Sequence, residues 1–224
     1  TIVLAFSSIA IAIVLGLLVG IVAAIFKDSW IDKLALLFGV FGMSIPSFFS
    51  AILIAWIFGF VLHDFTSLNM TGSLYSVDDY GRGEYLSVSN LILPALTLGI
   101  RPLAVIIQLT RASFLETLSK DFVRTAVAKG LSFKKVLSKH VLKNSLNPVI
   151  TAVSGWFASL LAGAVFVEYI FAWNGLGKEI VDALNQLDLP VVMGSVLTIA
   201  IMFISINILV DLIYAALDPR IKMN

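Results

Sequence analysis

Few residues in this chain could carry out covalent chemistry. The 224-residue sequence contains no cysteine, which excludes disulfides, thiolate metal sites and a cysteine nucleophile. The two histidines, His63 and His140, lie in different segments, and neither belongs to a metal-ligand cluster or a nucleophile–base pair. The turn Gly81-Arg82-Gly83 lies between charged residues and lacks the pattern of a phosphate-binding loop. The sequence therefore predicts no catalytic residue, no metal site and no cofactor bound by this chain.

The most unusual charged residue is Arg101, which lies in the middle of the apolar stretch Leu91–Leu109. A charge near the centre of a bilayer costs at least roughly 2.5–3.5 kcal/mol, so Arg101 should face a helix-bundle interior or a wet cavity. Two interpretations stay open: contacts with a carboxylate or carbonyls of another helix, or a cavity group that attracts an anionic carboxylate. Pro46 and Pro102 each remove a backbone donor, so we expect kinks there. Arg101, Pro102 and Pro46 are the candidates for lining a pathway.

A second group of polar residues occupies the stretch from about position 115 to 147, which is too polar to span a membrane and too patterned for a loose linker. Asp121–Lys129 is a short helical run, and Gly130 follows it where a left-handed helix cap would lie. Ser132 can then cap a second helix, Phe133 to about Ser145. We expect two short helices joined at a glycine corner. On composition alone, an interfacial amphipathic helix held by anionic lipid is the alternative.

The rest of the chain is strongly hydrophobic. Hydrophobic residues make up 59% of the sequence and charged residues only 13%, with a mean hydropathy of +1.02. A soluble domain carries roughly 25% charged residues, so about half of the expected surface charge is missing. The net charge of +1 and the lack of an aromatic and basic stripe give no indication of nucleic-acid binding. These properties predict an all-α membrane protein that has the lipid bilayer as its solvent.

Crossing the roughly 30 Å of bilayer hydrocarbon takes about 20 predominantly apolar residues in a helix. Five stretches meet this requirement: Ile2–Phe26, Leu34–Leu62, Leu91–Leu109, Val149–Val167 and Val191–Leu217. Within the first stretch, Gly16 and Gly20 have the spacing that lets two helices approach closely in lipid.

The charges between these stretches predict the orientation, because Lys and Arg accumulate in cytoplasmic loops. Positions 111–145 carry eight basic and two acidic residues, whereas the loops 63–90 and 168–190 each carry four acidic residues and one basic residue. We therefore predict a cytoplasmic basic stretch and two external loops, with Thr1 outside and Asn224 inside. A sixth helix upstream of Thr1 would bring both ends to the cytoplasm; a five-helix protein is the alternative.

Two residues at the predicted external end of the fourth span have expected roles as well. Glu168 is placed where water would solvate its carboxylate at little cost, and Trp173 is placed where aromatic rings anchor a protein at the membrane interface.

Three segments resemble one family. The run Arg124–Ser132, followed by Lys139–Pro148, resembles the cytoplasmic segment of ABC importer permeases, in the form typical of the dipeptide, oligopeptide and nickel branch. In the wider family, Glu and Ala stand at the first two positions of this run, where this chain has Arg and Thr. The segments Glu168–Gly177 and Asp218–Ile221 are similar to the corresponding parts of the same branch, with Asn174 where that branch has Pro. The likeness extends over essentially the whole chain.

The resemblance implies a polytopic helical bundle of the type I, methionine-importer-like kind, forming a single transmembrane domain over residues 1–224 in the bacterial inner membrane. As a permease subunit, the chain would carry peptides, or a related small solute such as nickel. Its partners would be a second permease, identical or homologous, two cytoplasmic ATPase subunits and an extracytoplasmic solute-binding protein. ATP and magnesium would be bound by the ATPase subunits, so this chain would not itself be an enzyme.

The resemblance also implies that the stretch 115–147 is a coupling segment that docks into a groove of an ATPase subunit. Its candidate contact residues are Arg124, Thr125, Ala126, Ala128, Lys129, Gly130 and Leu131. The small residues among them would allow close backbone approach, and the basic residues would pair with acidic groups of the ATPase. An ion-coupled secondary transporter is the alternative function, although the two related halves common in such transporters are not detectable here.

Overall fold

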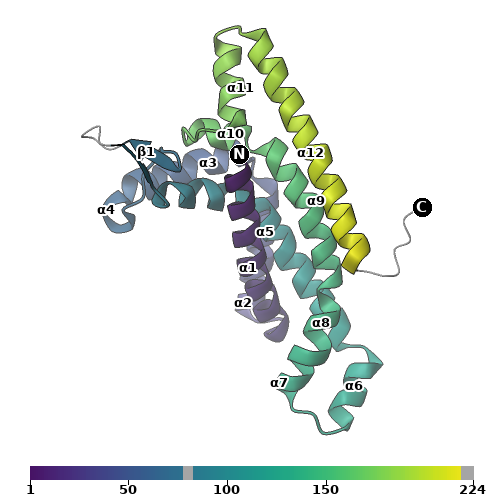
Figure 1. The fold of residues 1–224 in the computed structure, drawn as a ribbon. Helices are drawn as coiled ribbons and strands as arrows, with labels where there is room; N and C mark the ends of the chain where they lie inside the picture. The colour runs from purple at the N-terminus through teal and green to yellow at the C-terminus, as the bar shows by residue number, and fades with distance from the viewer. Residues whose placement is uncertain (78–82, 218–224) are drawn as a thin grey trace. The chain divides into compact units, whose positions relative to one another are not determined.

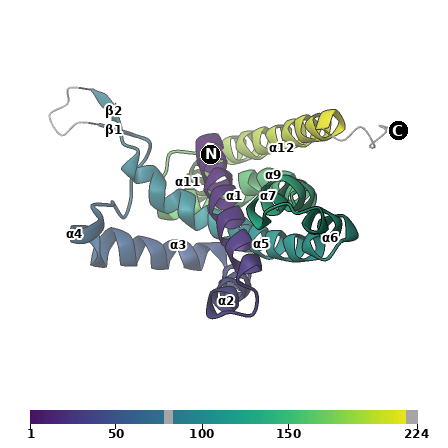
Figure 2. The same cartoon turned by 90° about the horizontal axis from the view of Figure 1, so that it is seen from below.

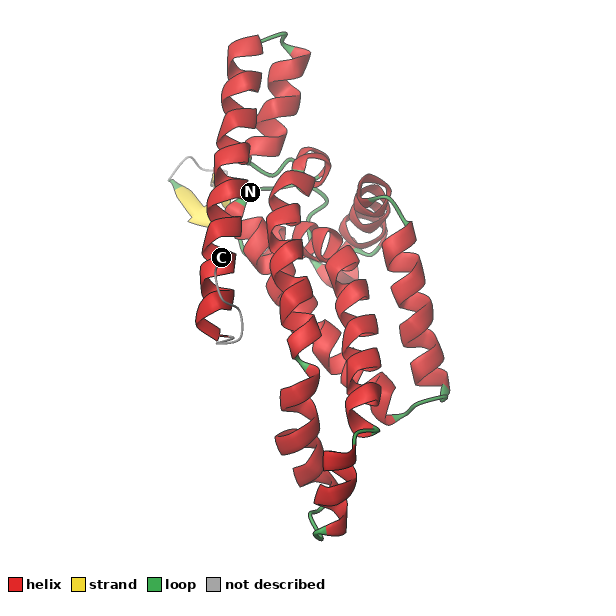
Figure 3. Ribbon diagram, turned by 90° about the vertical axis from the view of Figure 1, so that its right-hand side faces the viewer, coloured by secondary structure: helices red, strands yellow, loops and turns green. Residues whose placement is uncertain are grey.

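The computed structural model describes residues 1–77 and 83–217, with side chains at all of these positions except 154, 158, 161–163, 210, 211 and 213–217. The described part of the chain is almost entirely helical (Figure 3), in agreement with the all-α prediction. The exception is an antiparallel hairpin of two short strands, β1 (Tyr75–Val77) and β2 (Glu84–Leu86). The segment 218–221 that resembles the family's tail, and positions 81 and 82, lie outside the described residues.

Three helices among the described residues are long and apolar enough to cross a membrane. They are α1 (Ile2–Ile25), α5 (Ser89–Leu118) and the Leu189–Leu209 part of α12 (Leu189–Leu217). A fourth candidate is the broken pair of α2 (Trp30–Ser44) with α3 (Ser47–Trp56) and its π-helical continuation η1 (Ile57–Val61). In place of the fourth predicted span, the 17-residue α9 (Asn147–Gly163) is followed by the short α10 (Val165–Ile170). Three or four candidate spans therefore stand where five were predicted.

Pro46 has a stronger effect than the expected kink. Helix α2 ends before Ile45 and α3 begins after Pro46, so the predicted second span is divided into two helices. Proline restricts the residue before it to extended geometry, and Ile45 adopts it with φ −79° and ψ 129°. Pro102 lies inside α5, which continues through it as one 30-residue helix. The two prolines thus have different consequences.

The chain divides into two compact units. The first unit comprises residues 1–8, 46–98 and those from 154 onward, and the second comprises residues 9–45 and 99–153. In the first unit, α11 (Leu176–Asn185) packs against α10 and forms a hairpin with α12, visible at the top of Figure 1. The same unit contains α3, the short α4 (His63–Thr66) and the β1–β2 hairpin, which Figure 2 shows at its left.

In the second unit, α1 packs against α5 through glycine. A Cβ atom on Gly16 would lie 2.6 Å from Cγ2 of Ile106, and one on Gly20 would lie 2.7 Å from Cβ of Thr110. Both distances are shorter than any normal contact of a Cβ atom, so larger residues would force the helices apart. The predicted packing role of this glycine spacing is therefore confirmed.

The two expectations for the end of the fourth predicted span are wrong. Glu168 is fully buried, with 0% of its surface exposed, and Trp173 is 2% exposed. The reason is local: the backbone N–H of Trp173 donates a hydrogen bond to the carbonyl of Glu168 (2.8 Å), and the first turn of α11 covers the carboxylate. Both side chains are buried inside the protein, so Glu168 is not solvated by water and Trp173 does not anchor the chain at a membrane interface.

Candidate functional site

The segment 121–145, here called the knob, contains the two predicted helices and the glycine corner between them. Helix α6 spans Asp121–Ala128, and Gly130, two residues after its end, adopts the left-handed conformation with φ +79°. The N–H of Gly130 donates to the carbonyl of Val127 (2.9 Å), and the N–H of Leu131 donates to that of Ala126 (3.3 Å). This pair of bonds is the Schellman motif, which satisfies carbonyls at a helix end and requires a left-handed residue, most often glycine. The predicted cap is therefore confirmed.

The second helix of the knob is less regular than predicted. It consists of α7 (Phe133–Val136), the π-helical turn η2 (Leu137–Val141) and α8 (Leu142–Ser145). Val136 and Val141 are five positions apart, which in an α-helix would separate their directions by about 140°. Both are fully buried in the same cluster, because the π-helical turn brings residues five apart onto one face.

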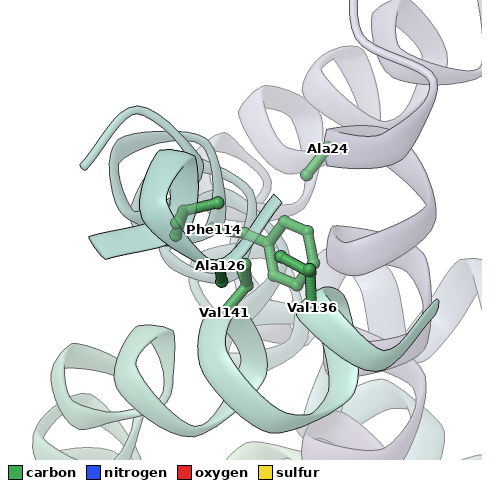
Figure 4. Close-up of a cluster of buried hydrophobic side chains, with 6 residues drawn as sticks. Ala24, Phe114, Ala126, Val136 and Val141 are labelled. Carbon is green, nitrogen blue, oxygen red and sulfur yellow. The ribbon is translucent and has the colours of Figure 1, made fainter. Parts of the chain in front are cut away.

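The knob packs around a hydrophobic core that it shares with α1 and α5, shown in Figure 4. Phe114 of α5 and Ala24 of α1 pack with four buried knob residues: Val123, Ala126, Val136 and Val141. In Figure 1 the knob lies at the lower end of the view, next to the ends of α1 and α5. These four residues are thus covered by the protein, and the face they form is not available to lipid.

The structure separates the candidate coupling residues into two groups. Arg124, Thr125, Ala128, Lys129 and Gly130 are exposed. Ala126 is buried in the core of the knob, and Leu131 packs partly buried against the same core. The small size of Ala126 therefore serves contacts inside the knob, and the idea that it allows close approach of another protein is not supported by its position.

Sequence reasoning missed three apolar residues on the surface of the knob. Phe122, Val127 and Phe133 are 40%, 54% and 59% exposed. The helical spacing groups Phe133 with Val136 and Val141 on one apolar face, but Phe133 is exposed whereas the two valines are buried. Large apolar side chains that stay exposed are candidates for a protein interaction surface where they form a continuous patch.

The surface of the knob is also basic. Within the described residues, the lysines at positions 129, 134, 135, 139 and 143 form no ion pair. Arg124 lies 3.7 Å from the carboxylate of Asp121, and Lys120 lies 3.1 Å from that of Glu116, with all four side chains at least half exposed. Such exposed pairs contribute little to stability, so the positive charge of this surface remains available to a partner.

A buried ion pair near the base of the knob was also missed. Asp32, in the first turn of α2, is 2% exposed, and Arg111 of α5 is 18% exposed. Arg111 donates through Nε to Oδ1 of Asp32 and through Nη2 to Oδ2 (2.7 Å), while the N–H of Asp28 also donates to Oδ2 (2.9 Å). This two-pronged arrangement ties α2 to α5 three residues before Phe114. Pairing between distant helices leaves no mark in local sequence, and Arg111 counted only as a loop charge.

The pathway candidates have separate surroundings. Arg101 is exposed on α5 and has no hydrogen bond or ion pair within the described residues, whereas Pro102 beside it is buried. Pro46 is exposed at the break between α2 and α3. An apolar cavity of about 430 Å³ lies between α1, α2 and α5, lined among others by Leu15, Trp30 and Leu103, and none of the three candidates lines it.

Among the described residues, no group of three His, Cys, Asp or Glu side chains could hold a metal ion.

Comparison with known proteins gives a consistent result. Residues 16–223 match the family described as binding-protein-dependent transport system inner membrane component. The dipeptide transport system permease protein of Alkalihalophilus pseudofirmus is 39% identical over 224 residues, covering 94% of this chain and 67% of that protein. The corresponding protein of Bacillus subtilis is 38% identical, covering 99% of this chain and 67% of its own length. The glutathione transport system permease protein of Pectobacterium atrosepticum is 40% identical over 96% of this chain and 65% of its length. The chain thus spans about two thirds of these relatives.

Proposed function

Because the chain belongs to the family of inner membrane components of binding-protein-dependent transport systems, we propose that it is the permease subunit of an ATP-driven peptide importer. Similar proteins carry names that refer to dipeptide and glutathione transport, and glutathione is itself a small peptide. These names favour a short peptide as cargo. Nickel or another small solute is the alternative cargo. The membrane location follows from the family and from the apolar helices.

The observation that carries the proposal is the knob. It is a folded projection whose buried residues pack with Ala24 of α1 and Phe114 of α5, and its outer surface combines exposed basic and apolar side chains. A surface of this kind suits a protein groove that has an apolar floor and acidic edges. We assign Arg124, Thr125, Ala128, Lys129 and Gly130, together with Val127 and Phe133, to the contact with an ATPase subunit. Ala126 and Leu131 support this contact from within the knob.

The arrangement in the membrane completes the proposal. We propose five crossings of the bacterial inner membrane in a single transmembrane domain of the type I importer kind. The broken pair α2–α3 would form the second crossing, and α9 with α10 would form the fourth. The knob and the C-terminus would lie in the cytoplasm, where two ATPase subunits bind ATP and magnesium. A second permease would complete the pathway, and a solute-binding protein would deliver the cargo from outside.

The test is reconstitution. The tagged chain is expressed together with the transport subunits encoded by neighbouring genes. The complex is purified and incorporated into proteoliposomes with a peptide-loaded binding protein. We expect the ATPase subunits to co-purify and uptake of labelled dipeptide to require ATP but to persist when ionophores abolish ion gradients. Uptake that needs an ion gradient and no ATP would instead identify an ion-coupled secondary transporter.

A further inference from the structure

Glu168 of α10 is a buried carboxylate that the proposed function does not yet use. It is fully buried, and its Oε2 accepts a hydrogen bond of 2.7 Å from the backbone N–H of Gly177. Its other oxygen, Oε1, has no hydrogen-bond partner among the described residues and lies 3.3 Å from the nitrogen of Thr1. Burying a carboxylate costs free energy unless hydrogen bonds or charges compensate for it.

The hydrogen bond from Gly177 shows what Glu168 holds. Helix α11 begins at Leu176, and its cap residue, Gly175, has no side chain that could accept a bond from the first turn. Glu168 supplies the missing acceptor from another helix, and its negative charge lies at the positive end of the α11 dipole. The carboxylate therefore caps the first turn of α11 at Gly177, while the N–H of Leu176 donates to Oγ1 of Thr1 (2.9 Å).

Two glycines are required by this arrangement. A Cβ atom on Gly175 would lie 2.4–2.5 Å from the carboxylate atoms of Glu168. One on Gly177 would lie 2.4 Å from Cα of Val165 and 2.9 Å from Oε2 of Glu168. These contacts are too short for any side chain, so the backbone of residues 175–177 is packed directly on α10. A Cβ atom at position 175 would collide with the side chain of Glu168, whereas one at position 177 would collide with the backbone of Val165.

The preceding connection is fixed as well. The N–H of Gly72 donates to the carbonyl of Phe171 (2.8 Å), and the N–H of Asn174 donates to Oγ of Ser73 (3.3 Å). Ala172 between them has a positive φ of +53°, a strained conformation for a residue with a side chain. The segment 171–177 is thus held at several points, and the carboxylate of Glu168, three residues before it in sequence, binds its end at Gly175 and Gly177.

We propose that Glu168 is a positioning residue for the permease's response to its solute-binding protein. It fixes the segment 171–177 and the start of the α11–α12 hairpin, which the loop charges predict to be on the external side, where a binding protein would arrive. A surface that is already ordered binds a partner without the entropy cost of ordering it. Losing the cap should therefore weaken the productive encounter with the binding protein. This inference rests on the proposed function.

The experiment measures ATPase activity of the reconstituted complex against the concentration of peptide-loaded binding protein. In Glu168→Ala and Gly175→Ala, we expect the half-saturating concentration to rise about tenfold, the effect of one lost hydrogen bond to a charged group. Glu168→Gln, which keeps an acceptor oxygen, should recover part of this loss. Gly155→Ala and Gly194→Ala are the matched controls, because a Cβ atom at either glycine meets nothing within 4 Å.

Double variants test the geometry. Glu168→Ala removes the atoms that obstruct a side chain at position 175, so Glu168→Ala/Gly175→Ala should be no worse than Glu168→Ala alone. Glu168→Ala/Gly177→Ala should be worse than Glu168→Ala, because the backbone of Val165 remains in place. Additive losses in the first pair would contradict the assigned contact.

Two outcomes would overturn the inference without touching the proposed function. In the first, the variants lower the yield and thermal stability of the complex while the half-saturating concentration stays unchanged, which identifies Glu168 as a folding residue only. In the second, Gly175→Ala and Gly155→Ala behave alike. Failure of the wild-type chain to co-purify with ATPase subunits would instead refute the proposed function itself.

Discussion

Ala126 and Ala128 lie two positions apart on the same short helix but have different surroundings. Ala126 is 6% exposed and packs with Phe114, Val136 and Val141, whereas Ala128 is exposed on the outer surface of the knob. The same substitution at the two positions should therefore report on different properties, the folding of the knob and the contact with a partner.

We predict that Ala126→Trp overpacks the core of the knob, at a cost of roughly 1–3 kcal/mol or more, and lowers the thermal stability of the purified chain. Ala128→Trp should leave thermal stability unchanged and reduce association with the ATPase subunits in a pull-down. Unchanged association in Ala128→Trp, with uptake at the wild-type level, would count against the assigned contact surface.

Gly130 combines an exposed position with a conformation that favours glycine. A Cβ atom there would meet nothing within 4 Å, so the only penalty of a small side chain is the left-handed backbone at φ +79°. We predict that Gly130→Ala destabilises the knob by about 1 kcal/mol, and that Gly130→Asn, which tolerates this conformation better, costs less. Proteolysis rates at the knob lysines would measure both. Equal rates in the two variants would contradict the cap as the source of the effect.

Arg101 has no partner within the described residues, which leaves its charge available for a cargo carboxylate. If it meets the cargo, Arg101→Gln should reduce uptake of free-carboxylate peptides far more than uptake of C-terminally amidated peptides, with assembly unchanged. Equal loss for both peptides, or reduced assembly, would make Arg101 a structural residue that pairs with another helix or with the second permease.

At the scale of elements, the Asp32–Arg111 pair joins α2 to α5 at the base of the knob. Removing one partner of a buried pair leaves the other charge uncompensated. We predict that Asp32→Ala destabilises the chain by about 3 kcal/mol and that the exchange Asp32→Arg/Arg111→Asp restores part of the loss. Thermal unfolding in detergent measures both variants.

The exposed pair Lys120–Glu116 offers the matched control for that measurement. Its side chains are 50% and 71% exposed, so Lys120→Ala should change stability by no more than about 1 kcal/mol. Comparable losses in Lys120→Ala and Asp32→Ala would show that burial does not determine the strength of the inner pair.

The elements also show how far local sequence rules extend. The helix 121–128, the left-handed Gly130 and the close packing at Gly16 and Gly20 were predictable, because each depends on a residue type at a fixed position along one helix. The π-helical turn at Leu137–Val141 was not predictable, because the α-helical spacing of apolar residues, three and four positions apart, does not include the five-residue spacing of a π-helix. Glu168 was misplaced for a related reason: its burial depends on α11, which follows it in sequence and folds back over it.

At the scale of the whole molecule, the long helices differ in how much of their apolar surface the chain itself covers. In the most apolar window of α5, 61% of residues are buried, and in that of α12 only 6% are buried. Leu197, Ile201, Ile204 and Ile208 of α12 are each more than half exposed. Exposing so much apolar surface to water is unfavourable, so this side of α12 requires contact with lipid or with the apolar surface of another subunit.

The orientation of the molecule is the property on which the assignments of the knob and of Glu168 both depend. It rests on the asymmetry of eight basic residues in positions 111–145 against the acidic loops 63–90 and 168–190. Single cysteines in this cysteine-free chain can test it, and the structure indicates where to place them. Ser138 is exposed on the knob, and Val77 is 67% exposed at the end of β1, whereas the nearby Ser76 hydroxyl accepts a hydrogen bond from Asn90 and is better left intact.

We predict that an impermeant thiol reagent added to intact cells labels Val77→Cys and does not label Ser138→Cys. Permeabilising the inner membrane should make Ser138→Cys reactive, which controls for its exposure, and the unmodified chain controls for background. Both variants must retain uptake for the result to apply to the working transporter. Labelling of Ser138→Cys alone in intact cells would reverse the orientation. The knob would then face away from any source of ATP, and the segment held by Glu168 would lie out of reach of a binding protein.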